Sequence, residues 1–233
     1  MRARRMIITV DGPSGAGKTT LARMLAARLA FRYVDTGALY RAVGWWVIHL
    51  GLDPASEDHL GQACETARIS VGWDQTGRMR VACAGRDVTE KLRGEAMGMV
   101  ASQVSARAVV RQYLWGLQRD LATKERLVFE GRDMGSQVFP DAPLKFFLTA
   151  SLQERARRRW TELLEAGHRV TLEQVMEDMC RRDHQDSNRQ LAPLTVPDGA
   201  VVIDTTGSSI QEVLERMMME VRTRFGYAVV TPG

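Results

Sequence analysis

Long hydrophobic runs are missing from this sequence of 233 residues. No apolar stretch approaches the roughly 18 residues that a membrane-spanning helix needs. The apolar run at residues 6–10 is too short for the hydrophobic region of a signal peptide, and a glycine-rich segment follows it. We therefore expect a cytoplasmic protein with no membrane partner.

Cysteine is also scarce. The three cysteines, Cys64, Cys83 and Cys180, are odd in number and form no C-x-x-C pair. This pattern argues against a disulfide framework and against a zinc site. We expect reduced and partly buried thiols.

Lysine is nearly absent among the basic residues, because only 4 of the 32 are lysine and the rest are arginine. The planar fork of arginine suits bidentate contact with phosphate groups. A GC-rich genome would raise arginine equally well, so both explanations stay open. Composition alone does not distinguish small phosphate-bearing substrates from nucleic acid.

The alternation of segments predicts an α/β protein with a parallel sheet. We predict core strands at residues 5–10, 31–34, 127–129, 144–148 and 200–203. We predict helices at residues 21–30, 38–50, 94–124, 152–166, 171–191 and 210–224, with Ser56 and Thr171 as helix N-caps. The expected fold is a five-stranded parallel sheet with helices on both faces, a P-loop three-layer architecture.

Residues 69–88 have a pattern of polar and apolar residues that differs from the segments around them. Alternating polar and apolar residues surround a turn at 74–77, which predicts a small antiparallel β insertion of two or three strands. We expect one domain over residues 1–233, with this insertion and an arginine-rich lid at about 152–170.

The sharpest motif is Gly12-x-x-x-x-Gly17-Lys18-Thr19, which follows a predicted strand and opens a predicted helix. Its glycines allow backbone N–H groups to surround phosphate oxygens, Lys18 reaches the β- and γ-phosphates, and Thr19 or Thr20 turns a hydroxyl towards Mg²⁺. Thr19 is our metal candidate, directly or through a water. The predicted ATP-binding residues are Gly12, Pro13, Ser14, Gly15, Ala16, Gly17, Lys18, Thr19 and Thr20.

Several signatures that accompany other phosphate-binding proteins are absent from the sequence. The protein-kinase motifs H-R-D-L-x-x-x-N and D-F-G do not occur. Neither does the Asn-Lys-x-Asp motif that GTPases resembling Ras use for guanine. A kinase for a small molecule is left as the main interpretation of the P-loop.

Two groups of arginines are spaced as if they share a helix face. Arg155, Arg158 and Arg159 form one group, which would lie over a transferring phosphoryl group. Arg182 and Arg189 form the other, with Asp186 between them at i, i+4, i+7 spacing. An exposed basic face and a solvated ladder of ion pairs are the plainer alternatives.

Five segments together resemble the bacterial cytidylate kinases, and the resemblance runs in order along essentially the whole chain. They are the opening Ile8 to Lys18, the D-[ST]-G-A-x-Y-R segment at 35–41, the A-S-x-V-[AS] segment at 101–105, the G-R-D-[MI]-G segment at 131–135 with V-F-P-x-A at 138–142, and the R-D-x-x-D segment at 182–186 with A-P-L at 192–194. Gly135-Ser136-Gln137 departs from the usual glycine-threonine pair.

The resemblance implies an enzyme of pyrimidine metabolism that moves the γ-phosphoryl group of ATP, with Mg²⁺, onto CMP or dCMP. It implies catalytic roles for Lys18, Arg132, Arg155, Arg158 and Arg159, and typically a monomer. For CMP it implies base contacts from Asp133, Arg111, Ser102 and Thr36, phosphate contacts from Arg41, Arg132 and Arg189, and sugar contacts from Asp186, Arg182 and Tyr40. A carboxylate accepts from the exocyclic amine of cytosine and would repel the carbonyl of uracil.

Two alternatives stay open. The first is a kinase for UMP, AMP or shikimate. The second is a nucleic-acid-binding P-loop protein, whose affinity would fall steeply with salt. The arginines occur at separate motif positions rather than in one run, so we expect ATP and CMP or dCMP as partners and no nucleic acid.

Overall fold

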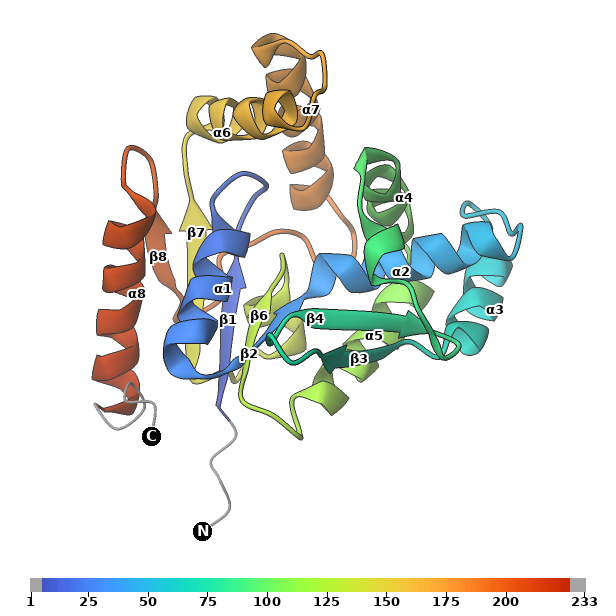
Figure 1. The fold of residues 1–233 in the computed structure, drawn as a ribbon, viewed down its shortest axis with the longest axis horizontal. Helices are drawn as coiled ribbons and strands as arrows, with labels where there is room; N and C mark the ends of the chain where they lie inside the picture. Colours follow the sequence, from blue (N-terminus) through green and yellow to red (C-terminus); the bar gives the residue numbers. More distant parts are fainter. Residues whose placement is uncertain (1–5, 227–233) are drawn as a thin grey trace. The chain divides into compact units, whose positions relative to one another are not determined.

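The computed structural model describes residues 6–226. Five strands form a parallel sheet in the order β2-β6-β1-β7-β8, and helices surround it (Figure 1). The strands are β1 (Ile7–Asp11), β2 (Arg32–Asp35), β6 (Leu127–Glu130), β7 (Leu144–Thr149) and β8 (Val201–Asp204). The predicted fold class is therefore confirmed; Arg5, where we predicted the first strand to begin, lies outside the described residues.

The chain divides into two compact units, and the prediction of a single domain stays a prediction. Unit 1 comprises residues 32–127, and unit 2 comprises residues 6–31 and 128–226 of the described chain.

Unit 2 contains most of the sheet core. Ile8 and Val10 of β1 are fully buried, and β1 pairs with β7, which pairs in turn with β8. Four helices belong to this unit, and α1 and α8 pack against each other beside the sheet (Figure 1). They are α1 (Lys18–Leu29), α6 (Leu152–Glu165), α7 (Leu172–Ser187) and α8 (Ile210–Phe225), with a π-helical turn η2 at Met134–Val138.

Side-chain caps explain where several helices begin. Thr171 accepts from the N–H of Gln174, and the side chain of Gln174 accepts from the N–H of Thr171, which together form a capping box at the start of α7. Ser56 caps α3 in unit 1 in the same position. Both predicted N-caps are confirmed.

Unit 1 is mostly helical, with the predicted insertion on it. Its elements are α2 (Thr36–His49), α3 (Glu57–Ala67), β3 (Ser70–Trp73), β4 (Met79–Cys83), β5 (Arg86–Asp87), a 3-10 turn η1 (Thr89–Leu92), α4 (Glu95–Ser105) and α5 (Ala108–Leu121). β3, β4 and β5 form an antiparallel sheet, as predicted. The N–H of Gly77 donates to the carbonyl of Asp74 at 2.9 Å and closes the predicted turn.

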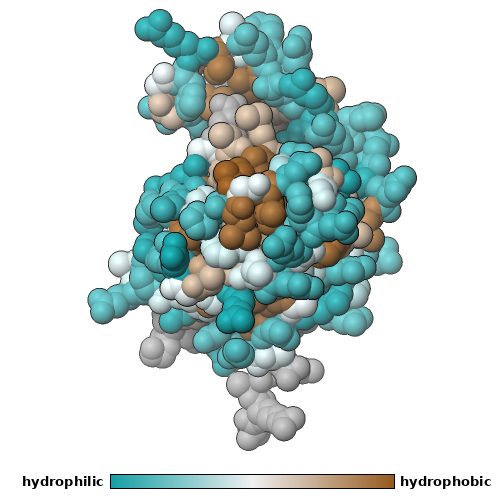
Figure 2. Space-filling view, turned by 90° about the vertical axis from the view of Figure 1, so that its right-hand side faces the viewer, coloured by the Kyte–Doolittle hydropathy of each residue, from teal (hydrophilic) through white to brown (hydrophobic). Residues whose placement is uncertain are grey.

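Unit 1 exposes large hydrophobic side chains at the end of α2. Figure 2 views the molecule from the right-hand side of Figure 1, and it shows a group of exposed hydrophobic residues in the middle of a largely hydrophilic face. Ile48, Leu50 and Met99 are the exposed large hydrophobic side chains of this unit. Exposed apolar residues are common on protein surfaces.

Two predicted helix boundaries are wrong. The helical pattern predicted over about 94–124 is interrupted at Ala106 and Arg107, because Arg107 has an extended backbone (φ −95°, ψ 133°) and starts α5 as its N-cap. The helix predicted to reach residue 191 ends at Ser187. Both the backbone N–H and the side-chain amide of Asn188 donate to the carbonyl of His184, which ends the helix there.

The three cysteines are free thiols. Cys64 and Cys83 are buried in unit 1, and burial raises the pKa of each to about 11. Cys180 is exposed on α7. Among residues 6–226, no helix is long and apolar enough to cross a membrane.

Candidate active site

The phosphate loop lies between the end of β1 and the start of α1. Gly12, Gly15 and Gly17 all have positive φ angles, of 142°, 76° and 83°. A Cβ atom at residue 12 would lie 2.0 Å from the carbonyl oxygen of Leu148, so only glycine fits there. The loop conformation that the motif predicts is thus enforced by both backbone geometry and packing.

Lys18 is the first residue of α1 and is only 4% exposed. Its ammonium donates to the carbonyl of Pro13 at 2.6 Å, across the loop. Burial and the nearby positive charge of Arg132 both lower the pKa of Lys18. A bound triphosphate would supply the negative charge that favours the ammonium form.

Thr19 and Glu130 form a polar pair beside the loop. The hydroxyl of Thr19 donates to Oε1 of Glu130 at 2.7 Å, where β6 ends. A hydroxyl and a carboxylate next to phosphate groups are oxygen ligands of the kind that Mg²⁺ takes together with substrate phosphates. The residues present therefore fit the metal that we predicted for Thr19. Thr20 is exposed on the next position of α1.

The second predicted arginine group gathers around one carboxylate. Asp186 is 2% exposed; its Oδ2 accepts from Nε of Arg132 at 3.1 Å, and its Oδ1 accepts from Arg189. Burial opposes ionisation of Asp186, but Arg132, Arg189 and Arg182 outweigh burial and hold its pKa below the usual range. Burial and the neighbouring positive charge of Arg132 lower the pKa of Arg182.

This arrangement confirms that Arg182, Asp186 and Arg189 lie near one another, but not for the predicted reason. Arg189 lies beyond the end of α7, so the three do not share one helix face. The backbone N–H of Leu194 donates to the carbonyl of Asp186 at 2.8 Å, and the chain turns back on itself after the helix.

Arg155 points into unit 2 rather than into solvent. Its guanidinium donates to the carbonyls of Ala150 at 3.0 Å and Ser14 at 3.1 Å, and it pairs with Asp183 at 2.7 Å. The side chain is 7% exposed. Arg155 therefore connects α6 with both the phosphate loop and α7, and its predicted catalytic role stays a prediction.

Arg158 and Arg159 have different surroundings. Arg158 donates to the hydroxyl of Thr205 at 3.0 Å, to its carbonyl at 2.7 Å and to Glu154 at 2.9 Å. The hydroxyl of Thr205 in turn donates to the carbonyl of Ala16 in the phosphate loop at 3.4 Å. Arg159 is more exposed and pairs with Glu162 at 3.1 Å.

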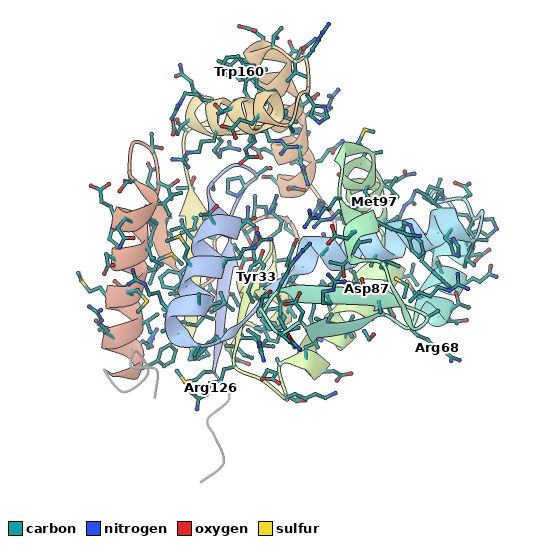
Figure 3. The ribbon with its side chains drawn as sticks, in the orientation of Figure 1. Tyr33, Arg68, Asp87, Met97, Arg126 and Trp160 are labelled. Atoms are coloured by element: carbon teal, nitrogen blue, oxygen red, sulfur yellow. The ribbon has the colours of Figure 1, made fainter. Side chains whose placement is uncertain are left out.

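A small hydrophobic cluster holds α6 and α7 together. Ala156 and Leu163 of α6 pack with Val175 and Met179 of α7. Trp160, labelled in Figure 3, packs against this cluster, and its indole N–H donates to the carbonyl of Val170 at 3.0 Å. The predicted lid at 152–170 thus includes all of α6 and the connection to α7.

Asp133 is 2% exposed in unit 2, immediately before η2. The other predicted CMP-binding residues, Thr36, Tyr40, Arg41, Ser102 and Arg111, belong to unit 1. Asp35 caps α2 by accepting from the N–H of Ala38, and it also pairs with Arg41 at 2.7 Å. Thr36 is the buried first residue of α2. The chain thus turns at residues 35–36 to present Arg41 on the first turns of that helix.

Tyr40 and Arg111 lie together inside unit 1. Arg111 is 1% exposed; it donates to the carbonyl of Ser105 at 2.6 Å and to the hydroxyl of Tyr40 at 3.4 Å. Ser102 is half-buried on α4, and its carbonyl accepts from the hydroxyl of Ser105. A fully buried arginine is costly unless it is paired or binds a ligand.

Comparison with known proteins identifies the family of this chain. The sequence profile of the cytidylate kinase family matches residues 8–223. The chain belongs to the cytidylate kinase family. It is 45% identical over 230 residues to the cytidylate kinase of Geobacter sulfurreducens, covering 99% of this chain and 97% of that one. It is 45% identical over 221 residues to the cytidylate kinase of Stutzerimonas stutzeri, covering 94% and 96%.

A solved structure supports the fold. The chain resembles an uncharacterized protein from Eubacterium ventriosum with a TM-score of 0.53 at 12% identity, over 94% of this chain and 99% of that one. Sequence identity this low is evidence for the fold alone and not for the function. The chemistry rests on membership of the cytidylate kinase family and on the side chains described above.

Sequence reasoning on the cytidylate kinase motifs missed four acidic residues that the structure brings into the site. Glu130 accepts from Thr19, Glu154 from Arg158, Asp183 pairs with Arg155, and Asp11 accepts from two backbone N–H groups. Glu154 is four residues from Arg158, a spacing that could have been recognised as a helical ion pair. The other three contacts join distant parts of the chain.

Proposed function

We propose that this protein transfers the γ-phosphoryl group of ATP to CMP or dCMP, giving ADP and CDP or dCDP. The observation that supports it most strongly is the buried Lys18 at the start of α1, inside a glycine loop, in a chain of the cytidylate kinase family. A loop of this kind binds nucleoside triphosphates, and membership of the cytidylate kinase family indicates CMP or dCMP as the acceptor.

The phosphate loop would bind ATP. The N–H groups of residues 12–19 and the N-terminus of α1 favour the phosphates, and Lys18 reaches the β- and γ-phosphates. Thr19 and Glu130 would hold Mg²⁺, directly or through water. When bound, Mg²⁺ neutralises charge on the β- and γ-phosphate oxygens.

The cytidylate kinase motifs assign ten residues to CMP. Arg41, Arg132 and Arg189 would bind the acceptor phosphate, which carries negative charge that arginine recognises well. Asp186, Arg182 and Tyr40 would contact the sugar. Asp133, Arg111, Ser102 and Thr36 would read the base, with Asp133 accepting from the exocyclic amine of cytosine.

The transfer needs no general base, because the acceptor is already a phosphate oxyanion. The attacking oxygen of CMP and the leaving oxygen of ADP would lie in line with the γ-phosphorus, so alignment and charge stabilisation supply the catalysis. Lys18, Arg132 and the lid arginines Arg155, Arg158 and Arg159 would stabilise the developing charge. The guanidinium of Arg155 also donates to the carbonyl of Ser14 at 3.1 Å, so Arg155 fixes the phosphate loop as well.

We further propose that the protein acts as a monomer in the cytoplasm, without nucleic-acid or membrane partners. Light scattering on purified protein tests the monomer, and a single species of about twice the chain mass would contradict it. Binding of single-stranded nucleic acid that weakens steeply with salt would support the alternative of a nucleic-acid-binding protein.

The decisive experiment is a coupled ADP-release assay with Mg-ATP and CMP, dCMP, UMP, AMP, GMP or shikimate as acceptor. Turnover led by CMP and dCMP is the expected result. Preference for another acceptor would keep a P-loop kinase but contradict the roles given to Asp133 and Arg111. Binding of ATP without turnover on any acceptor would contradict the proposed reaction.

A further inference from the structure

Asp11 is a buried carboxylate with no role in the reaction proposed above. It is the last residue of β1, it is 0% exposed, and the phosphate loop begins immediately after it. Its Oδ1 accepts from the N–H of Met134 at 2.9 Å, and its Oδ2 accepts from the N–H of Gly135 at 2.8 Å. Each oxygen of the carboxylate thus bonds a different backbone donor 123 or 124 residues away in the chain.

The segment that Asp11 contacts contains two residues assigned to the acceptor. At its other end, the N–H of Gly131 donates to the carbonyl of Val10 at 3.1 Å. Arg132 and Asp133 lie between these two points of attachment. Residues 131–135 are therefore bonded at both ends to the end of β1, where the phosphate loop starts.

A carboxylate is a costly way to fill this position if stability is its only purpose. Burial raises the pKa of Asp11 to about 7, while the backbone N–H groups of Gly135 and Met134 and the charge of Lys18 oppose that rise. Buried charges lower stability unless their partners compensate fully, and an apolar residue of similar size would avoid the cost. Asp11 accepts from the two N–H groups at once, which an apolar residue does not do.

We infer that Asp11 is a positioning residue, which fixes the segment carrying Arg132 and Asp133 relative to the phosphate loop without touching either substrate. The inference rests on the proposed CMP kinase reaction. In-line transfer requires the acceptor oxygen to lie on the axis of the γ-phosphorus, and a displacement of about 1 Å can lower the rate roughly 100-fold. Asp11 joins the two segments that would hold the two reacting groups.

The test compares Asp11→Asn with Thr9→Val. Asparagine keeps the shape, but it offers one acceptor and one donor group, so one of the two N–H groups loses its partner. Thr9 is two residues earlier on the same strand and equally buried, and its hydroxyl has no hydrogen-bond partner among the described residues. The side chain of Thr9 also borders Gly135. Valine is nearly isosteric there, so Thr9→Val controls for a buried change beside the same segment that leaves the two hydrogen bonds of Asp11 in place.

Steady-state kinetics and ATP affinity distinguish positioning from loss of structure. We expect Asp11→Asn to lower kcat with CMP by about 100-fold while the Kd of a fluorescent ATP analogue changes by less than about threefold. Thr9→Val should stay within about twofold of the wild type in both quantities. A folded Asp11→Asn protein with wild-type kcat would overturn the inference, as would equal losses in kcat and in ATP affinity.

Amide hydrogen exchange provides a readout that needs no turnover. In Asp11→Asn, peptides covering 131–138 should exchange at least about tenfold faster than in the wild type, while peptides of α8 are unchanged. Equal exchange in the two proteins would overturn the inference. Absence of CMP turnover in the wild type would instead contradict the proposed function. If Asp11→Asn does not fold, Asp11→Ser is measured in the same way. Fast exchange of residues 131–138 in the wild type itself would also refute the inference that Asp11 fixes this segment.

Discussion

Asp186 provides a quantitative test of the arginines gathered around it, because its carboxylate is the negative charge between Arg132, Arg182 and Arg189. Its side chain is 3% exposed, and it pairs with Arg132, which is 21% exposed, and with Arg189, which is 12% exposed. In Asp186→Asn, the guanidinium groups would lose this charge and repel one another. Removing one member of a buried ion pair costs roughly 3–5 kcal/mol, and asparagine keeps one acceptor, so we expect a loss of about 3 kcal/mol in the free energy of unfolding.

The matched control lies on the same helix. Asp178 pairs with Arg181 on α7, but the two side chains are 62% and 69% exposed. Exposed pairs contribute at most about 1 kcal/mol, so Asp178→Asn should have little effect. Urea denaturation of the wild type and both variants at pH 7 gives the three free energies.

The dependence on pH and on phosphate sharpens the test. The pKa of Asp186 is depressed in the folded protein, so its contribution is fully present above the unfolded pKa and is lost as pH falls through the folded value. The difference between wild type and Asp186→Asn should therefore shrink in acid. Inorganic phosphate should stabilise the variant more than the wild type, because it can replace the missing negative charge. A loss no larger than that of Asp178→Asn would refute this account of a desolvated carboxylate.

Three further variants test the rest of the site. Lys18→Met should lower kcat by at least about 100-fold in the ADP-release assay, because the transferring phosphate loses a buried positive charge, and normal turnover would contradict the assigned role. Gly12→Ala should weaken binding of a fluorescent ATP analogue at least about tenfold, because its Cβ would meet the carbonyl oxygen of Leu148 at 2.0 Å. The Cβ of Gly17→Ala would meet nothing closer than 3.6 Å, so this variant has only the strain of its positive φ. Equal effects of the two variants would argue against the packing explanation. Asp133→Asn should reduce the preference for CMP over UMP by about tenfold in kcat/KM, and an unchanged ratio would remove Asp133 from base recognition.

The sequence allowed the parts of this fold that depend on local chemistry to be predicted. The strand-loop-helix at residues 7–29 follows from its glycines and apolar pattern, and the start of α7 follows from Thr171 and Gln174. The break between α4 and α5 carries no glycine or proline, so local pattern did not indicate it. The early end of α7 depends on bonds from Asn188 that compete with helix continuation.

In the candidate site, too, residues in local motifs were predictable from the sequence and contacts between distant segments were not. Lys18 and Thr19 are identified by motif spacing, and the cytidylate kinase motifs point to Arg132 and Asp133. Contacts between distant segments are different, because the pairing of Asp11 with the backbone at 134–135 leaves no periodicity in the sequence. Helical spacing placed Arg155 in one group with Arg158 and Arg159, but the three side chains have different surroundings. The spacing did not reveal that the guanidinium of Arg155 donates to the carbonyl of Ser14.

The distribution of the three thiols gives this protein a ready-made attachment point for a spectroscopic label. Maleimides react with the thiolate form, and burial both shields Cys64 and Cys83 and raises their pKa to about 11. Cys180 is exposed on α7, two residues before Arg182. Unmodified protein should therefore accept one dye at Cys180, seen as a single mass increment. The fluorescence of that dye would then report on α7 as nucleotides bind, with no engineered cysteine.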